Sequence, residues 1–340
     1  MFNYPARILF CLTLCVGTLI SISSNSWFGA WAGLEVNLLS FIPLISTKGM
    51  MSVEASLKYF LTQALASILL FFSILFFLGY YKTTFVPVFS NFSILMLFNT
   101  ALLIKLGAAP FHFWFPGVME GVSWGTSIIL MTWQKLAPLV LISYTFYSSV
   151  LIYTSVLLSS LIGALGGMNQ TSLRKIMAYS SINHLGWILS GMLLNNLYWF
   201  VYFLFYSFLS GSLVILFMNL QLSQFNHLFL IKDSNFFNKI SLFGNFLSLG
   251  GLPPFLGFFP KWLIIQGLAT SGHILLISII TSLTLVVLFY YLRIFFASIT
   301  ISNMGTKWQL PDPYWSPLSS CLAGISIFGL PLFPLFYSFF

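Results

Sequence analysis

Charged residues are scarce in this sequence, and their scarcity excludes an ordinary soluble domain. Asp, Glu, Lys and Arg make up 5% of the 340 residues, whereas hydrophobic residues make up 59%. Soluble domains average about 25% charged residues, so the composition predicts a polytopic membrane protein. The net charge of +8 comes from scattered lysines and arginines that form no basic face, which argues against nucleic acid as a partner.

Cysteine is also rare, and the motifs that hold cofactors are missing from the sequence. Cys11, Cys15 and Cys321 form no CxxC pair and no His/Cys spacing typical of a metal site, so we interpret them as packing residues. The sequence contains no GxGxxG dinucleotide fingerprint, no Walker A loop and no hydrolase elbow. We therefore expect this chain to bind no metal, nucleotide or redox cofactor by itself.

Long hydrophilic stretches are lacking as well, so we expect the whole chain, residues 1–340, to form a single transmembrane domain. Apolar segments of about 20 residues cross a bilayer as helices, and the sequence contains about eleven of them. They cover residues 7–23, 27–45, 54–79, 93–121, 124–144, 149–168, 174–193, 197–220, 239–271, 273–296 and 317–338. The sequence therefore predicts an all-α membrane protein.

The basic residues between these segments indicate how the chain is oriented. Only Lys82 falls on the side opposite the N-terminus. The N-terminal side, or helix ends that face it, holds Arg7, Lys48, Arg174, Lys175, Lys232, Lys239, Arg293 and Lys307. Because basic residues collect on the cytoplasmic or matrix side, we expect the N-terminus on that side and the C-terminus on the other.

Two of the segments, 93–121 and 239–271, are longer than a span requires, and each contains the same motif. Residues 110–116 and 254–260 both read Pro-Phe-x-x-aromatic-Phe-Pro, with a glycine three residues before each. Proline interrupts a helix, and a break at bilayer depth is tolerated only inside protein or beside a wet cavity. We predict two broken helices, near 107–116 and 250–260. Their opposite directions indicate an inverted repeat with halves of roughly 27–145 and 174–296.

Few ionisable residues lie inside the predicted spans. Glu35, Lys105, Lys135 and Lys261 are near the middle of four of them, and Lys58 is about one turn inside another. Such groups are costly in a bilayer and are functional-site hypotheses by default. Apolar surroundings disfavour a charged lysine and a nearby carboxylate favours it, so a lysine between both can take up and release a proton. We expect the four central residues to form a row across the membrane plane.

Structural interpretations stay open for several of these residues. Glu35 can be a buried ion-pair partner, and Lys58 can extend its ammonium to the membrane surface. His112 lies inside the first break, where it either relays protons or caps backbone groups. His184 either extends a proton path or hydrogen-bonds a neighbouring helix.

At these positions the sequence resembles a known family. The residues that carry the likeness are Trp27–Pro43 with Glu35, Glu54–Gln63, Lys105–Pro116, Lys135, Gln170–Gly186 and Gly250–Trp262. They resemble the antiporter-like membrane subunits of mitochondrial NADH:ubiquinone oxidoreductase, respiratory complex I, and among these the insect-like chain 2 group. That family is similar to Mrp-type cation/proton antiporters, and the likeness runs over nearly the whole chain.

The resemblance implies an antiporter-like fold and a proton-translocating subunit in the mitochondrial inner membrane, with the N-terminus in the matrix and the C-terminus in the intermembrane space. It implies that Glu35, Lys105, Lys135 and Lys261 form the translocating row, with Lys58 as an associate. It also implies that NAD, FMN, iron–sulfur clusters and ubiquinone belong to partner subunits. Those partners include neighbouring antiporter-like subunits, and lipids such as cardiolipin fit the basic side.

Two other functions remain open at this stage. A free-standing cation/proton antiporter would use the same residues without a redox partner. A structural spacer subunit would hold the lysines only as pairing groups.

Overall fold

The computed structural model describes residues 5–47, 49–81, 92–145, 149–230, 236–300 and 317–330. In these ranges the named secondary-structure elements are all helices, and the only β-type pairing is an isolated bridge between Ser172 and Gln224. The predicted all-α class is confirmed, and helices lie in each predicted apolar segment. Lys48, Lys82, Lys232 and Lys307 lie outside the described residues, so the orientation drawn from them stays a prediction.

Within the described ranges, seven helices are long and apolar enough to cross a membrane. They are Pro5–Ser23, Trp27–Ile45, Met50–Tyr80, Trp124–Tyr144, Val150–Gly167, Asn196–Asn219 and Ile274–Phe296. Phe92–Leu106, Ile240–Gly250 and Ser319–Phe328 are shorter apolar helices. A multi-pass membrane protein follows from these lengths, whereas the count of about eleven crossings stays a prediction.

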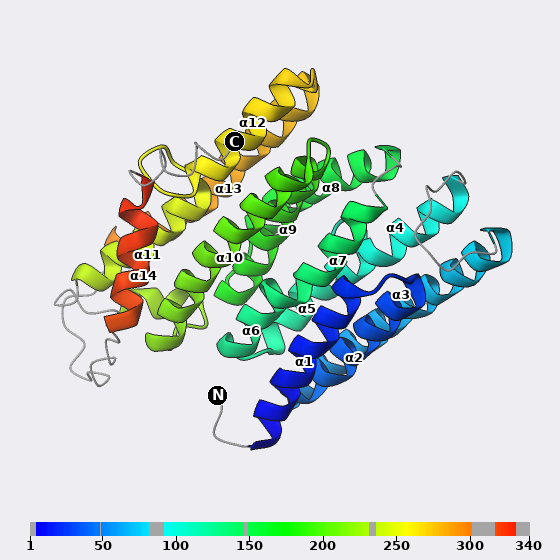
Figure 1. Ribbon diagram of the computed structural model, residues 1–340. Coiled ribbons are helices and arrows are strands. Elements are labelled where there is room, and N and C mark those ends of the chain that lie inside the picture. Colours follow the sequence, from blue (N-terminus) through cyan, green and yellow to red (C-terminus); the bar gives the residue numbers. More distant parts are fainter. Residues whose placement is uncertain are drawn as a thin grey trace. The chain divides into compact units, whose positions relative to one another are not determined.

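The first of two compact units covers Met1–Ser155. It contains α1 (Pro5–Ser23), α2 (Trp27–Ile45), α3 (Met50–Tyr81), α4 (Phe92–Leu106), α5 (Trp114–Gly121), α6 (Trp124–Met131) and α7 (Trp133–Tyr144). Helices α1 and α2 form a hairpin (Figure 1). Their backbones lie so close together that a Cβ on Gly33 would be 2.8 Å from the Gly17 carbonyl oxygen, and glycine at both positions permits this approach. Helix α3 packs against α2, α4 and α5.

The second compact unit covers Val156–Phe340. It holds most of α8 (Ser149–Gly167), then α9 (Leu173–Met192), α10 (Asn196–Asn219), the 3₁₀ helix η1 (Phe225–Leu230), α11 (Phe236–Gly250), α12 (Phe258–Thr270), α13 (Ile274–Thr300) and α14 (Pro317–Phe328). The buried amide of Asn245 joins three helices, because its Oδ1 accepts from Ser212 Oγ of α10 at 2.9 Å and Ser326 Oγ of α14 at 2.5 Å. The predicted halves, 27–145 and 174–296, fall one in each unit, and the inverted repeat itself stays a prediction.

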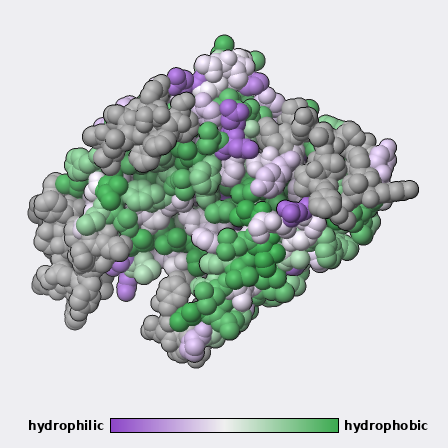
Figure 2. Space-filling view, in the orientation of Figure 1, coloured by the Kyte–Doolittle hydropathy of each residue, from purple (hydrophilic) through white to green (hydrophobic). Residues whose placement is uncertain are grey.

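Large apolar side chains cover much of the outside of the helices. Leu12 and Leu19 of α1 are 62% and 63% exposed, and Leu65 of α3 is 62% exposed. Figure 2 shows hydrophobic residues over wide areas of the viewed face. Contiguous apolar surface of this kind is rare on soluble monomers and suits contact with lipid or other membrane subunits.

Candidate functional site: buried lysines at helix interruptions

The chain leaves helical geometry between α4, which ends at Leu106, and α5, which begins at Trp114. Gly107 adopts φ +70°, a conformation that glycine reaches without steric cost, and the Ala109–Pro110 peptide bond is cis. The last carbonyls of α4 find donors outside the helix. Trp114 Nε1 donates to Ile104 O at 3.0 Å, and Gln63 Nε2 donates to Lys105 O at 3.3 Å. The interruption is therefore hydrogen-bonded rather than left open.

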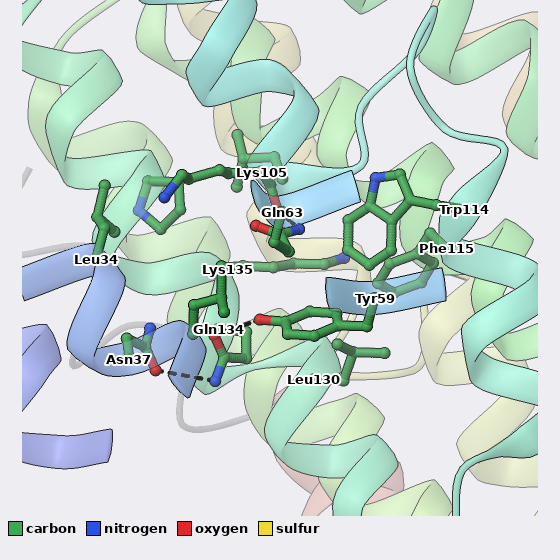
Figure 3. A pocket seen from close by; sticks show the side chains of 13 residues that line it. Leu34, Asn37, Tyr59, Gln63, Lys105, Trp114, Phe115, Leu130, Gln134 and Lys135 are labelled. Carbon is green, nitrogen blue, oxygen red and sulfur yellow. Dashed lines mark hydrogen bonds between the residues drawn. The ribbon is translucent and has the colours of Figure 1, made fainter. Parts of the chain in front are cut away.

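Lys105 lies in the last turn of α4 and is 7% exposed. Glu35, half-buried on α2, interacts electrostatically with it. In Figure 3 the Lys105 side chain extends toward α2, the helix that carries Glu35. The C-terminal end of a helix also carries partial negative charge, so the ammonium has two sources of compensation.

Lys135 lies next to a second irregularity, which the sequence prediction missed. Trp124–Tyr144 has the length and apolarity of one membrane span, as predicted, but its helix is interrupted: α6 ends at Met131 and α7 begins at Trp133, with Thr132 at φ −111° and ψ −72° between them. Pro138 also lacks the N–H that would bond the Gln134 carbonyl. Lys135 is 2% exposed, and its Nζ lies 4.9 Å from the centre of the Phe115 ring, within cation–π range.

Both lysines line one small cavity of about 20 Å³, which has room for a water molecule. Figure 3 shows the Lys135 side chain crossing this space toward Trp114 and Phe115. Its walls are Leu34, Asn37, Leu38, Tyr59, Gln63, Lys105, Leu106, Trp114, Phe115, Leu130, Gln134, Lys135 and Pro138. A water-sized space lined by two buried lysines and by polar side chains is a setting in which a proton can pass by way of water.

A chain of neutral polar groups borders this cavity. The Tyr59 hydroxyl donates to Gln134 Oε1 at 3.3 Å, and Gln134 Nε2 donates to Asn37 Oδ1 at 3.0 Å. All three side chains are at most 9% exposed. Sequence reasoning missed these residues and Gln63. The available signal was the position of Asn37 two residues after Glu35 and of Gln134 directly before Lys135.

Lys261 lies at the interruption between α11, which ends at Gly250, and α12, which begins at Phe258. It is 6% exposed, and its Nζ donates to Gly250 O at 2.7 Å and to Leu249 O at 3.3 Å. The ammonium thus caps the carboxyl end of α11, where a cation is favoured. Gly251, which follows α11, has φ +79°.

The remaining candidates lie in different surroundings. His112 Nδ1 is 3.2 Å from Pro110 O inside the first interruption, and His184 Nδ1 is 2.9 Å from the Tyr202 hydroxyl, which joins α9 to α10. Lys58 is exposed on α3, 3.7 Å from Glu54 Oε2, and does not line the cavity. Proton relay by His112 and His184 stays a prediction.

The structure brings together part of the predicted row. Lys105 and Lys135 share a cavity and Glu35 acts on Lys105, all within the first unit. Lys261 and His184 lie in the second unit, so a row through all of them stays a prediction. Among the described residues, no group of three or more His, Cys, Asp or Glu side chains is arranged to hold a metal ion.

Comparison with known proteins identifies several relatives. The model of the transmembrane family NADH:quinone oxidoreductase/Mrp antiporter matches residues 24–287. NADH-ubiquinone oxidoreductase chain 2 of Anopheles gambiae is 49% identical over 335 residues, and that of Aedes aegypti is 51% identical over 334, each covering 97% of both chains. A chain of respiratory complex I from Thermus thermophilus has the same fold, with a TM-score of 0.86 at 23% identity over 98% of this chain and 79% of that one. A chain of the Mrp complex from Dietzia sp. DQ12-45-1b gives a TM-score of 0.79 at 18% identity over 89% and 62%.

Proposed function

The chain belongs to the NADH:quinone oxidoreductase/Mrp antiporter family of transmembrane subunits, and we propose on this basis that it is a proton-translocating membrane-arm subunit of respiratory NADH:ubiquinone oxidoreductase. It is a subunit of an enzyme that couples electron transfer from NADH to ubiquinone to proton pumping. The near-full-length match to two mosquito chain 2 proteins favours this function over a free-standing antiporter or a structural spacer.

The observation that carries the function is the pair of buried lysines, Lys105 and Lys135, on one water-sized cavity. An ammonium at bilayer depth is costly unless it faces protein or water. Irregular backbone at that depth is tolerated for the same reason. A packing role needs neither feature, because apolar side chains fill such a space at lower cost.

The mechanism is charge coupling along the ionisable residues. Redox chemistry in partner subunits changes the charge or environment of Glu35, and the proton affinity of Lys105 responds because the two side chains interact electrostatically. A proton then moves through the cavity between Lys105 and Lys135, and the change continues to Lys261. Moving one charge against 100 mV requires about 2.3 kcal/mol. Changes in proton affinity of about two pKa units supply this amount.

The proposal includes the number of membrane crossings and the side on which each terminus lies. About eleven helices cross the mitochondrial inner membrane. The pairs α4–α5 and α11–α12 each count as one broken crossing in an inverted repeat, and α6–α7 as one interrupted crossing. The N-terminus lies in the matrix and the C-terminus in the intermembrane space. Support comes from the basic residues on the N-terminal side in the sequence and from the likeness to NADH-ubiquinone oxidoreductase chain 2 of Anopheles gambiae.

Cofactor chemistry belongs to other chains of the complex in this proposal. NAD, FMN, iron–sulfur clusters and ubiquinone are bound by partner subunits, and this chain contacts other membrane-arm subunits, including antiporter-like neighbours. The exposed apolar helix faces provide the contact area for these neighbours and for lipid. Cardiolipin headgroups are attracted to the basic residues of the matrix side.

Replacing Lys105 by Met in the assembled enzyme tests the function. Methionine keeps the length of the side chain and removes the titrating group, so we expect fewer protons pumped per NADH oxidised in proteoliposomes. Lys58→Met tests the associate role that the resemblance implies, and because Lys58 is exposed and does not line the cavity, we expect normal stoichiometry from it, against that role. Full proton stoichiometry at normal electron flux in Lys105→Met would remove Lys105 from the mechanism.

A further inference from the structure

At the two helix interruptions, backbone carbonyls at corresponding positions accept hydrogen bonds from different kinds of donor. Two residues before Gly107, the carbonyl of Lys105 accepts from the neutral amide of Gln63. Two residues before Gly251, the carbonyl of Leu249 accepts from the ammonium of Lys261, which also bonds Gly250 O. The second interruption therefore uses a titratable cation where the first uses a neutral group.

We propose that Gly251 is a positioning residue for Lys261, because its lack of a side chain lets the ammonium lie on the last carbonyls of α11. A Cβ at position 251 would lie 2.8 Å from Lys261 Cδ and 2.9 Å from Lys261 Nζ. Real Cβ atoms do not approach other heavy atoms this closely, so any residue other than glycine displaces the lysine. The inference rests on the proposed role of Lys261 in proton transfer.

The position of the ammonium matters because of what it faces. The carboxyl end of α11 carries partial negative charge, and this effect falls off within one helical turn. Glu35 acts on Lys105 from a separate helix, whereas Lys261 obtains its compensation from the backbone it touches. A displaced Lys261 therefore loses both hydrogen bonds together with the favourable helix end.

Backbone strain has to be separated from displacement of the lysine. Gly251 has φ +79°, so alanine is strained there whatever surrounds it. Gly272, between α12 and α13, has φ +82° and no heavy atom within 4 Å of a Cβ built on it. Gly272→Ala is therefore a matched control that introduces the strain without the clash.

The experiment compares Gly251→Ala, Gly272→Ala and Lys261→Ala, with the double variant Gly251→Ala/Lys261→Ala, in the assembled enzyme. Proton pumping in proteoliposomes is measured for each, and the density of Lys261 in a high-resolution structure is measured for Gly251→Ala and Gly272→Ala, which keep the lysine. We expect Gly251→Ala to lose about tenfold in pumping rate, as for a displaced reacting group, with Lys261 off both carbonyls. Gly272→Ala retains pumping, and the double variant pumps no worse than Lys261→Ala, because residues that act through one another are non-additive.

Several outcomes overturn the inference. Lys261 remaining on both carbonyls in Gly251→Ala, with pumping unchanged, is one. Normal pumping by Gly251→Asn is another, because asparagine tolerates positive φ but carries a Cβ. If Gly251→Ala fails to assemble, assembly of the double variant supports the inference, and its failure overturns it. Full pumping by Lys261→Ala would instead refute the proposed role of Lys261, while the density in Gly251→Ala still reports whether Gly251 sets its position.

Discussion

Replacing Gln134 by Leu separates the packing role of the polar chain at the cavity from a role in proton transfer. Gln134 accepts a hydrogen bond from Tyr59 and donates one to Asn37, and all three side chains are buried. Leucine has a similar volume but makes neither bond. The Tyr59 hydroxyl and the Asn37 amide oxygen are then left without these partners inside the protein.

The structure sets the size of the effect. A buried polar group that loses its partner costs about 1–3 kcal/mol, so the two groups together cost about 2–6 kcal/mol. Removing all the partners at once is far less costly, because no polar group is left unsatisfied. The triple variant Asn37→Leu/Tyr59→Phe/Gln134→Leu is thus expected to be more stable than the single Gln134→Leu variant.

Two measurements on the assembled enzyme are needed. The half-time of heat inactivation reports stability, and proton pumping in proteoliposomes reports transfer. We expect Gln134→Leu to shorten the half-time and the triple variant to restore it, while pumping stays low in both because the cavity has lost its polar wall. Restored pumping in the triple variant would show that the chain serves packing alone. An unchanged half-time in Gln134→Leu would contradict the hydrogen-bond reasoning itself.

Two further predictions concern single contacts. Asn245→Leu removes the acceptor shared by Ser212 and Ser326, while each hydroxyl keeps a backbone carbonyl of its own helix as acceptor. We therefore expect α14 to be held less firmly by about 1 kcal/mol for each lost bond between helices, seen as faster proteolysis near that helix. Resistance equal to the wild type would contradict this role. Trp114→Phe keeps an aromatic ring at the cavity but removes the donor to Ile104 O, and a net loss of about 1 kcal/mol should appear as faster amide exchange at Gly107 and Ala108. Unchanged exchange would mean that the indole bond contributes nothing to the interruption.

The interruptions after Gly107 and Gly251 were predictable because both glycines stand before matching proline motifs, and glycine and proline act through the backbone itself. That each interrupted pair forms one broken membrane crossing stays a prediction. The interruption at Thr132 was missed because no glycine or proline stands at that position. Pro138, the nearest proline, lies well inside α7 and gives no signal at Thr132, so the predicted helix was continuous there.

The candidate site was predictable only where a charge marked it. Lys105, Lys135 and Lys261 were identifiable because ammonium groups are rare in apolar segments. Asn37, Tyr59 and Gln134 were not, because neutral polar residues are common in membrane helices and their hydrogen bonds cross from one helix to another. The contact of Lys261 with Gly250 O was not predictable, because the sequence does not show that the first turn of α12 lies beside the end of α11.

The indole of Trp114 has a consequence for how this region can move. Its hydrogen bond to Ile104 O joins the first residue of α5 to the last turn of α4 and so holds the two helices together across the interruption. Helices α4 and α5 cannot open about this interruption as a hinge unless that bond breaks. Rotation of side chains and exchange of water beside Lys105 leave this bond intact, and such motions are faster than the microsecond-to-millisecond swings of whole helices.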